Sequence, residues 1–131
     1  MNRKLISTLA IAVVTLALAG CPHQAPVYNV NNATVVANVD NVSSEQVRKA
    51  IIRAGGGLGW IITDVKPGEL EGTLHLRSHT AKVSIPYSTK SYSIIYKDSV
   101  DLDYNEGTIH SNYNGWIENL HRAIQVQLSQ L

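Results

Sequence analysis

Apolar residues recur along residues 43–131 with two different periods, and these periods predict the elements of one small domain. In the first stretch they are three or four positions apart, at Val47, Ala50, Ile51 and Ala54. That spacing places them on one face of an α-helix. Ser43 and Gln46 form a capping box at its start, and we expect Gly55-Gly56-Gly57 to end it. The pattern therefore predicts a short amphipathic helix over residues 44–54.

Beyond the glycines the apolar period changes to two, which is typical of β-strands with one buried face. A strand over residues 60–65 and a turn at Lys66-Pro67-Gly68 come first. The alternating apolar residues of the next three strands are Leu70, Leu74 and Leu76, then Ala81, Val83, Ile85 and Tyr87, and then Tyr92, Ile94 and Tyr96. Pro86 has no N–H for a strand ladder, so we expect it at a strand end or on an edge. The pattern predicts an antiparallel meander.

A second helix is predicted near the C-terminus. Its apolar residues are again three or four positions apart, at Ile117, Leu120, Ile124, Leu128 and Leu131. Asn112 or Asn114 is expected to cap this helix, after a small hairpin at Asn105-Glu106-Gly107. Together the elements predict an α+β fold, in which a four- to five-stranded antiparallel sheet carries an N-terminal and a C-terminal helix on one face.

Residues 1–20 have a different pattern. Arg3 and Lys4 precede an apolar run from Leu5 to Leu18, which is the order of a secretory signal peptide. As a helix at about 1.5 Å per residue the run spans roughly 21 Å, whereas a bilayer core is about 30 Å thick. We therefore expect a signal peptide and not a permanent membrane span.

The end of this run, Leu18-Ala19-Gly20-Cys21, resembles the lipobox of bacterial lipoproteins. The resemblance implies cleavage before Cys21, a diacylglyceryl group on its sulfur and, usually, an acylated new amino terminus. Several acyl chains hold a protein stably on a membrane. Pro22 follows in place of aspartate, which in such lipoproteins is typical of sorting to the outer membrane. The alternative is an ordinary signal peptide followed by a chance cysteine.

The chain thus divides into three predicted parts: the signal peptide (1–20), a lipid-anchored tether (21–42) and a single α+β domain (43–131). The tether is rich in asparagine and holds two prolines, which is typical of a linker. Its valines also allow an edge strand at Val35–Val39.

Charge and cysteine content exclude some classes of protein. The chain has 11 Lys and Arg and 10 Asp and Glu, and loss of the two cations in the signal peptide leaves the remainder slightly acidic. Nothing in this balance favours nucleic-acid binding. Because Cys21 is the only cysteine, the domain has no internal disulfide and must be stabilised by packing.

Residues 86–116 are enriched in tyrosine, serine and asparagine. Rigid aromatic rings among short hydrogen-bonding side chains are typical of recognition surfaces. The strand period turns Tyr92 and Tyr96 toward the core, so the candidate binding residues of this segment are Tyr104, Tyr113 and Trp116.

A second candidate surface is cationic. His75, Arg77, His79 and Lys82 fall on one predicted hairpin, where they could line the open face of the sheet and bind a carboxylate or phosphate. The alternative is an ordinary solvated sheet face.

Two other patterns depart from known sites. The run Gly55–Gly57 follows a helix and precedes a strand, whereas a phosphate loop follows a strand and precedes a helix. The spacing of Asp101, Asp103 and Asn105 resembles the start of a calcium loop, but Glu106 stands where that loop needs glycine. We expect no metal and no cofactor apart from the covalent lipid on Cys21.

The segment from Val83 to Leu120, with its YSIIY and NYNGW motifs, is similar to small uncharacterised lipoproteins of proteobacteria. The resemblance implies a cell-envelope location and no known activity. We expect an outer-membrane lipoprotein facing the periplasm, which acts as a non-enzymatic binding or adaptor module for an envelope protein.

Two alternatives remain: a module for cell-wall glycan or a small ligand, and a hydrolase. The hydrolase requires at least two members of one set to meet in a pocket: His75, His79, His110, His121, Asp101 and Asp103.

Overall fold

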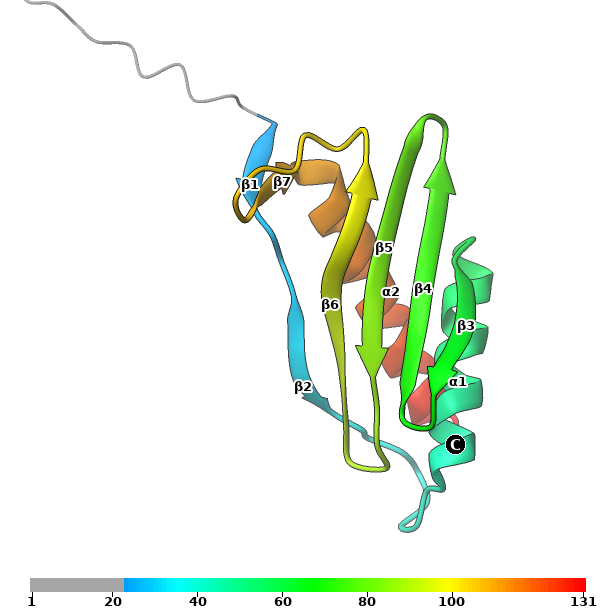
Figure 1. Cartoon of the computed structure of the whole chain (residues 1–131). Coiled ribbons are helices and arrows are strands. Elements are labelled where there is room, and N and C mark those ends of the chain that lie inside the picture. Colours follow the sequence, from blue (N-terminus) through cyan, green and yellow to red (C-terminus); the bar gives the residue numbers. More distant parts are fainter. Residues whose placement is uncertain (1–22) are drawn as a thin grey trace, which may run out of the picture.

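The computed structural model describes residues 23–131, so the predicted signal peptide and the lipobox cysteine, Cys21, lie outside the described residues. The elements in chain order are β1 (Gln24–Pro26), β2 (Val30–Thr34), α1 (Ser44–Gly57), β3 (Ile61–Lys66), β4 (Glu69–Leu76), β5 (His79–Pro86), β6 (Ser91–Val100), β7 (Thr108–His110) and α2 (Ser111–Ser129). Figure 1 shows their arrangement.

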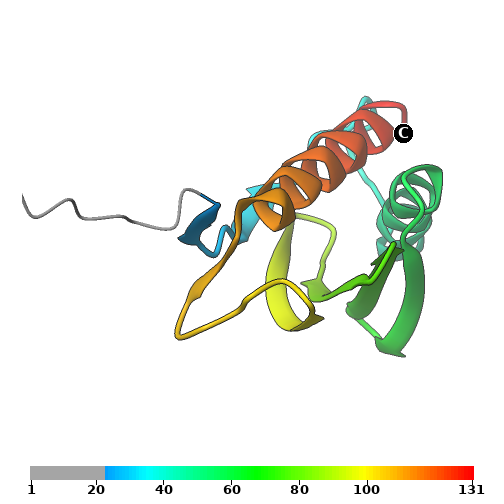
Figure 2. The same ribbon diagram turned by 90° about the horizontal axis from the view of Figure 1, so that it is seen from above.

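Five strands form one antiparallel sheet in the order β2-β6-β5-β4-β3. Strands β3 to β6 follow one another along the chain and across the sheet, which confirms the predicted meander. Both helices lie on the same face of the sheet (Figure 2). The predicted α+β fold, with one helix before and one after the meander, is therefore confirmed.

The start of α1 is as predicted, and its end is not. The Ser43 hydroxyl accepts from the Gln46 amide at 3.1 Å, and the Gln46 side chain accepts from the Ser43 amide at 2.9 Å. The helix then continues through the glycines to Gly57. The backbone becomes left-handed only at Gly59, with φ of 88°, so the glycines do not terminate the helix.

The first of these glycines has a packing role. A Cβ atom on Gly55 would lie 2.6 Å from Cγ1 of Ile62 on β3. Any side chain at this position would therefore push the helix away from the strand. Gly56 has no neighbour within 4 Å of such an atom, so close packing explains the glycine at position 55 only.

The start of α2 corrects the predicted cap. The helix begins at Ser111, and Nδ1 of His110 accepts from the amide of Asn112 at 3.2 Å. Asn114 instead accepts from the amide of Tyr28 and donates to the carbonyl of Pro26, both at 2.9 Å. This asparagine therefore attaches the β1–β2 connection to α2.

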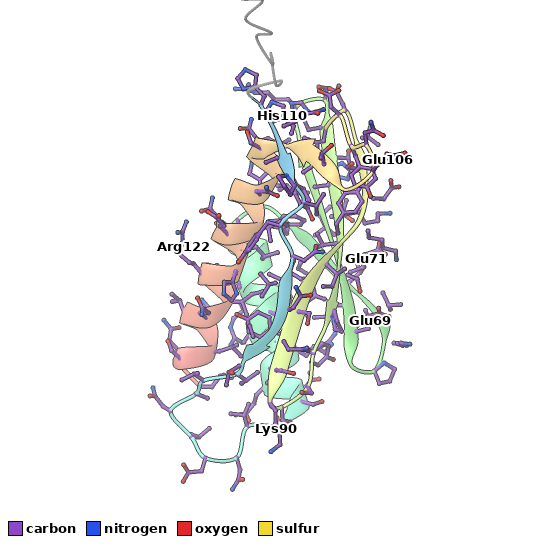
Figure 3. The ribbon with its side chains drawn as sticks, turned by 90° about the vertical axis from the view of Figure 1, so that its left-hand side faces the viewer. Glu69, Glu71, Lys90, Glu106, His110 and Arg122 are labelled. Carbon is purple, nitrogen blue, oxygen red and sulfur yellow. The ribbon has the colours of Figure 1, made fainter. Side chains whose placement is uncertain are left out.

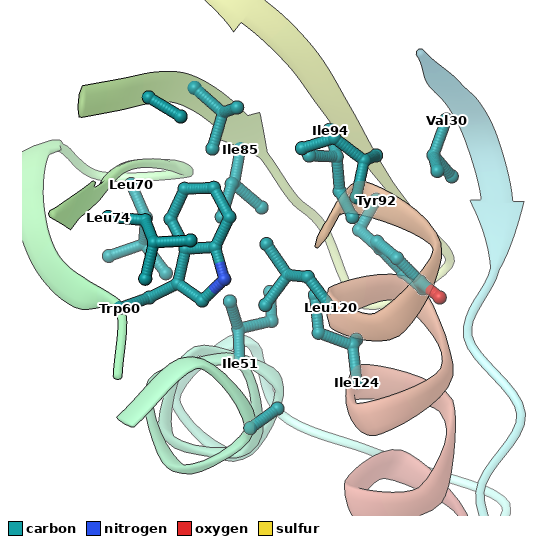
Figure 4. Close-up of a cluster of buried hydrophobic side chains, with 14 of the residues drawn as sticks. Val30, Ile51, Trp60, Leu70, Leu74, Ile85, Tyr92, Ile94, Leu120 and Ile124 are labelled. Carbon is teal, nitrogen blue, oxygen red and sulfur yellow. The ribbon is translucent and has the colours of Figure 1, made fainter. Parts of the chain in front are cut away.

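The core fills the space between the sheet and the two helices (Figure 4). Its members include Ile51 of α1, Leu70, Ile85 and Ile94 of the sheet, and Ile124 of α2, all fully buried. Complete burial of one such side chain contributes roughly 1.5–3 kcal/mol. The predicted apolar faces of both helices and of the meander are the faces that meet in this core.

The predicted tether is mostly part of the folded domain. Strand β1 pairs with β7, with Ala25 opposite Ile109. Strand β2 pairs with β6, with Val30 opposite Ile94, and forms an edge of the sheet. The edge strand thus lies before the predicted Val35–Val39. The first strand that the structure describes begins at Gln24, so paired strands of the domain already lie before the predicted boundary at residue 43.

The molecule has two distinct ends (Figure 1). The β1/β7 end, as we call it, consists of β1, β7, the turn between β4 and β5, and the 101–107 loop between β6 and β7. The turns after β3 and β5 and the start of α1 lie at the opposite end. Figure 3 marks the two ends by Glu106 and Lys90. Within residues 23–131, no helix is both long and apolar enough to cross a membrane.

Candidate functional site

The 101–107 loop is held at both of its ends. Leu102 is buried, and its carbonyl accepts from the amide of His110 at 2.9 Å. Asn105 and Thr108 pair across a tight turn whose central residues, Glu106 and Gly107, have φ of 46° and 86°. Two left-handed residues are typical of a short hairpin turn, so the predicted hairpin is confirmed.

The first two residues that the structure describes, His23 and Gln24, are bonded to α2 and to this loop. The side chain of Gln24 donates to the carbonyl of Asp103 at 3.2 Å. The carbonyl of His23 accepts from the amide of Ser111 at 2.6 Å. The rings of His23 and His110 stack with their centroids 5.7 Å apart. The point at which the described chain begins is therefore fixed relative to the β1/β7 end.

The three predicted aromatic binding residues have different environments. Tyr104 lies on the 101–107 loop, stacks on Tyr96 with ring centroids 4.4 Å apart, and is 47% exposed. Tyr113 is fully buried. Its ring and that of Tyr96 are in a T-shaped arrangement, with ring centroids 5.7 Å apart. The prediction that Tyr113 contacts a partner is wrong, because its ring belongs to the core.

The hydroxyl of Tyr113 has an unusual environment. It is buried and has no hydrogen-bond partner among residues 23–131. Burial also raises the pKa of Tyr113, so the group stays neutral. A buried hydroxyl without a partner destabilises the fold.

Trp116 is half-buried and borders a small hollow. The hollow has a volume of about 70 Å³ and is lined by Leu58, Trp60, Leu74, Trp116 and Asn119. The ring centroid of Trp116 lies 6.2 Å from that of His79. Ligand pockets commonly enclose about 300–1,000 Å³, so this hollow is too small to hold a ligand by itself.

A second, larger hollow lies next to the first, and the two share Leu58. Leu58 also borders a depression of about 280 Å³ between the outer sides of α1 and α2. Its apolar lining is Ala54, Gly57, Leu58, Ala123 and Val126. Leu58 is 43% exposed and Val126 is 54% exposed. We call this surface, from Trp116 past Leu58 to Val126, the helix groove.

Sequence reasoning missed most of the helix groove. Only Trp116 was among the candidates, because Leu58 follows the predicted helix and Val126 falls outside the core stripe of α2. An apolar residue that lies off the stripe of an amphipathic helix is the signal that marks such a surface.

The predicted cationic stripe is not formed. His75 and Lys82 point to the open face of the sheet, Arg77 occupies the β4–β5 turn, and His79 points to the helix side toward Trp116. Strand alternation explains this, because residues an odd number apart point to opposite faces. The four side chains therefore share no single surface.

Lys82 also lies beside an acidic residue. Its ammonium lies 3.6 Å from Glu71, which forms a second ion pair with Lys97. The hydrogen bond from Lys97 holds the pKa of Glu71 below its ordinary value, and Lys82 adds to this effect. Figure 3 shows Glu69 and Glu71 on the open side of the sheet, away from Arg122 on the helix side.

Two of the residues required for a hydrolase do meet. Nδ1 of His79 lies 2.6 Å from the backbone oxygen of Asp101, and the Ser78 hydroxyl donates to the Asp101 carboxylate at 2.5 Å. In a serine triad the histidine stands between the serine and the acid. Here the acid binds the serine, so these three residues do not form a triad. His110 caps α2, and His121 bonds to Tyr92.

A polar hollow at the opposite end was not predicted. It has a volume of about 360 Å³, and its lining includes Ser44, Arg48, Asp64, Lys66 and Tyr87. Arg48 binds both carboxylate oxygens of Asp64, at 2.7 and 2.6 Å. This pairing lowers the pKa of Asp64. No sequence signal linked residues so far apart, since the contact depends on how α1 packs on β3.

The chain matches no protein-family profile, and no curated protein is significantly similar to it. Within the described part of the chain, no three His, Cys, Asp or Glu residues are grouped so as to hold a metal ion.

Proposed function

We propose that this chain is a lipid-anchored protein of the bacterial cell envelope, which acts as a non-enzymatic binding or adaptor module. The observation that carries the proposal is the short distance along the chain between the lipobox cysteine, Cys21, and the first strand at Gln24. An extended chain covers at most about 3.6 Å per residue, so three residues reach only about 11 Å.

This short link favours a partner at the membrane surface. A lipid on Cys21 would keep the whole domain beside the bilayer, with the β1/β7 end closest to it. The residue after the cysteine, Pro22, favours the outer membrane, so we propose a domain on its periplasmic side. The partner is then a protein in the same membrane or bound to its surface.

The helix groove is the surface that we propose for this partner. It combines an indole at Trp116 with exposed aliphatic side chains at Leu58 and Val126. Aromatic residues are enriched at the centres of protein interfaces. The helices that form the groove are packed on the core, so the groove has its shape before a partner binds. Binding then costs little conformational entropy.

The experiment is photocrosslinking in cells from probes at Trp116 and Val126 of the lipidated protein. Gln125 is the matched control, because it is exposed on α2 and does not border the groove. We expect a discrete protein adduct from both groove probes, none from Gln125, and loss of the adduct in Cys21→Ser. Equal labelling from Gln125, or no adduct from either groove probe, would contradict the proposed partner.

A second candidate function is binding of a small ligand or a cell-wall glycan, and the polar hollow beside Tyr87 favours it. Its volume of about 360 Å³ falls within the ordinary range of ligand pockets, and the Tyr87 ring offers a surface on which a sugar ring could stack. Titration of the domain with soluble peptidoglycan fragments, followed by NMR, tests this function. Shifts at Tyr87 and Arg48 that disappear in Tyr87→Ala would support it, and an unchanged spectrum would exclude it.

A further inference from the structure

We infer that the β1/β7 end rests on the bilayer surface, with the side chains of Leu76, Val100 and Tyr104 in contact with the lipid headgroup region. This inference deepens the proposed function and rests on its lipid anchor. The proposed occupant of this end is the zwitterionic bilayer surface that holds the anchor, and not a protein.

The first residues that the structure describes are fixed at the β1/β7 end. His23 is bonded to Ser111, and Gln24–Pro26 is paired with β7. Only Pro22 separates Cys21 from His23, and two residue steps span at most about 7 Å. An acylated Cys21 at the membrane surface therefore allows little space between the bilayer and the β1/β7 end.

The segments of the β1/β7 end are joined to one another by hydrogen bonds. Asp101 at the end of β6 contacts both Ser78 and His79 at the β4–β5 turn. Gln24 joins the neighbouring Asp103 to β1. The turn, the loop and the first strand are thus connected by hydrogen bonds, so a membrane that holds one of them holds the others near its surface.

The β1/β7 end also carries exposed apolar side chains. Leu76 is 45% exposed and Val100 is 58% exposed, and they end β4 and β6 on opposite faces of the sheet. Tyr104 lies on the adjacent loop with its ring also exposed. Tyrosine is enriched at membrane interfaces because its ring is apolar and its hydroxyl is polar. All three side chains lie at the β1/β7 end, at the ends of β4 and β6 and on the 101–107 loop.

The charges of this end decide which lipid it prefers. The β4–β5 turn carries one permanent cation, Arg77, whereas the 101–107 loop carries Asp101, Asp103 and Glu106. A surface of this sign is not attracted to anionic lipid. The contact should therefore be strongest on zwitterionic lipid and should weaken as anionic lipid is added.

The experiment measures the depth of spin labels on the full, lipidated protein in phosphatidylcholine vesicles. Labels are placed by Leu76→Cys and Tyr104→Cys, with Lys90→Cys at the opposite end as the matched control (Figure 3). Cys21 is the only natural cysteine and its sulfur would carry the lipid, so each variant takes one label. Collision with oxygen reports lipid contact, and collision with a nickel chelate reports contact with water.

We expect the labels at positions 76 and 104 to shift toward oxygen relative to the label at position 90. In equal parts phosphatidylcholine and phosphatidylglycerol this shift should be smaller, and a larger shift would overturn the charge argument. Labels at 76 and 104 that are as open to the nickel chelate as the label at 90, in vesicles that retain the protein, would overturn the membrane contact alone. Protein that does not remain with the vesicles would overturn the lipid anchor and this inference with it.

Discussion

The amide of Ser111 donates a 2.6 Å hydrogen bond to the carbonyl of His23, which joins the beginning of the folded chain to the first turn of α2. The first amides of a helix have no partner within the helix. Here the N-terminal segment supplies one. Under the proposed lipid anchor, the same contact would hold the β1/β7 end next to the lipid on Cys21, so a bond at the start of the helix would also determine which end of the molecule faces a membrane.

Replacing Ser111 with proline should release the N-terminal segment and leave α2 intact. Proline is favoured at the first position of a helix, and the extended backbone of His110, with ψ of 130°, is compatible with a following proline. The substitution removes only the N–H that His23 accepts. We expect faster exchange of the amides of Gln24, Ala25 and Val27, with little change in α2. Ser111→Ala keeps the N–H and should behave as the natural protein; equal exchange in both variants would show that the bond does not hold the segment.

Adding a methyl group at Gly55 should destabilise the fold, although alanine favours helices. The new Cβ would lie 2.6 Å from Ile62, and overpacking of this kind costs about 1–3 kcal/mol. Gly56→Ala adds the same group on the same helix in open space and should stabilise it by about 0.5–1 kcal/mol. Urea unfolding of both variants tests this difference, and a stabilised Gly55→Ala would contradict the close packing of α1 on β3.

Removal of two buried tyrosine hydroxyls should have opposite effects. The Tyr113 hydroxyl has no partner within residues 23–131, so Tyr113→Phe should leave stability unchanged or raise it by up to about 1 kcal/mol. The Tyr92 hydroxyl lies 2.8 Å from Nδ1 of His121, and Tyr92→Phe should lower stability by about 1 kcal/mol. Thermal melts of the two single variants compare them directly; the reverse order would contradict the burial assigned to Tyr113.

His121 should make the free energy of unfolding depend on pH. Burial lowers the pKa of His121 below its ordinary value of 6.5. Between the lowered value and 6.5 the unfolded chain binds a proton that the folded chain does not, so the free energy of unfolding should fall as the pH drops through that window. Above it the contribution is complete. His121→Gln should flatten the profile and His75→Gln, on the exposed end of β4, should not; identical slopes in the two variants would rule His121 out as the cause.

The parts of the fold that were predictable depend on local periodicity. The stripes of α1 and α2 and the alternation in β4 and β5 are written in consecutive residues, and the hydrophobic effect acts on them directly. Strands β1 and β2 are short, and they form because they pair with β7 and β6, which lie far along the chain. Nothing in the local sequence indicates such pairing, which explains why this segment was predicted as a tether.

The candidate site was predictable in part, and one error was avoidable. Tyr113 lies four residues before Ile117 and so extends the buried stripe of α2. A helix start placed at Asn112 or Asn114 hid this relationship. By contrast, the pairing of Lys82 with Glu71 and the position of His79 depend on strand register. The helix groove required knowledge of how two helices pack together.

The proposed membrane location and orientation depend most on the attachment of lipid to Cys21. The mass of the mature protein tests this attachment most directly. The full chain is expressed in a Gram-negative host, extracted from the membrane fraction and measured intact, and its N-terminal peptide is then sequenced by mass spectrometry. We predict a chain that begins at Cys21 and carries a diacylglyceryl group on sulfur and an acyl group on the amino terminus. A mature chain that begins elsewhere, or an unmodified Cys21, would contradict the lipid anchor and the orientation derived from it.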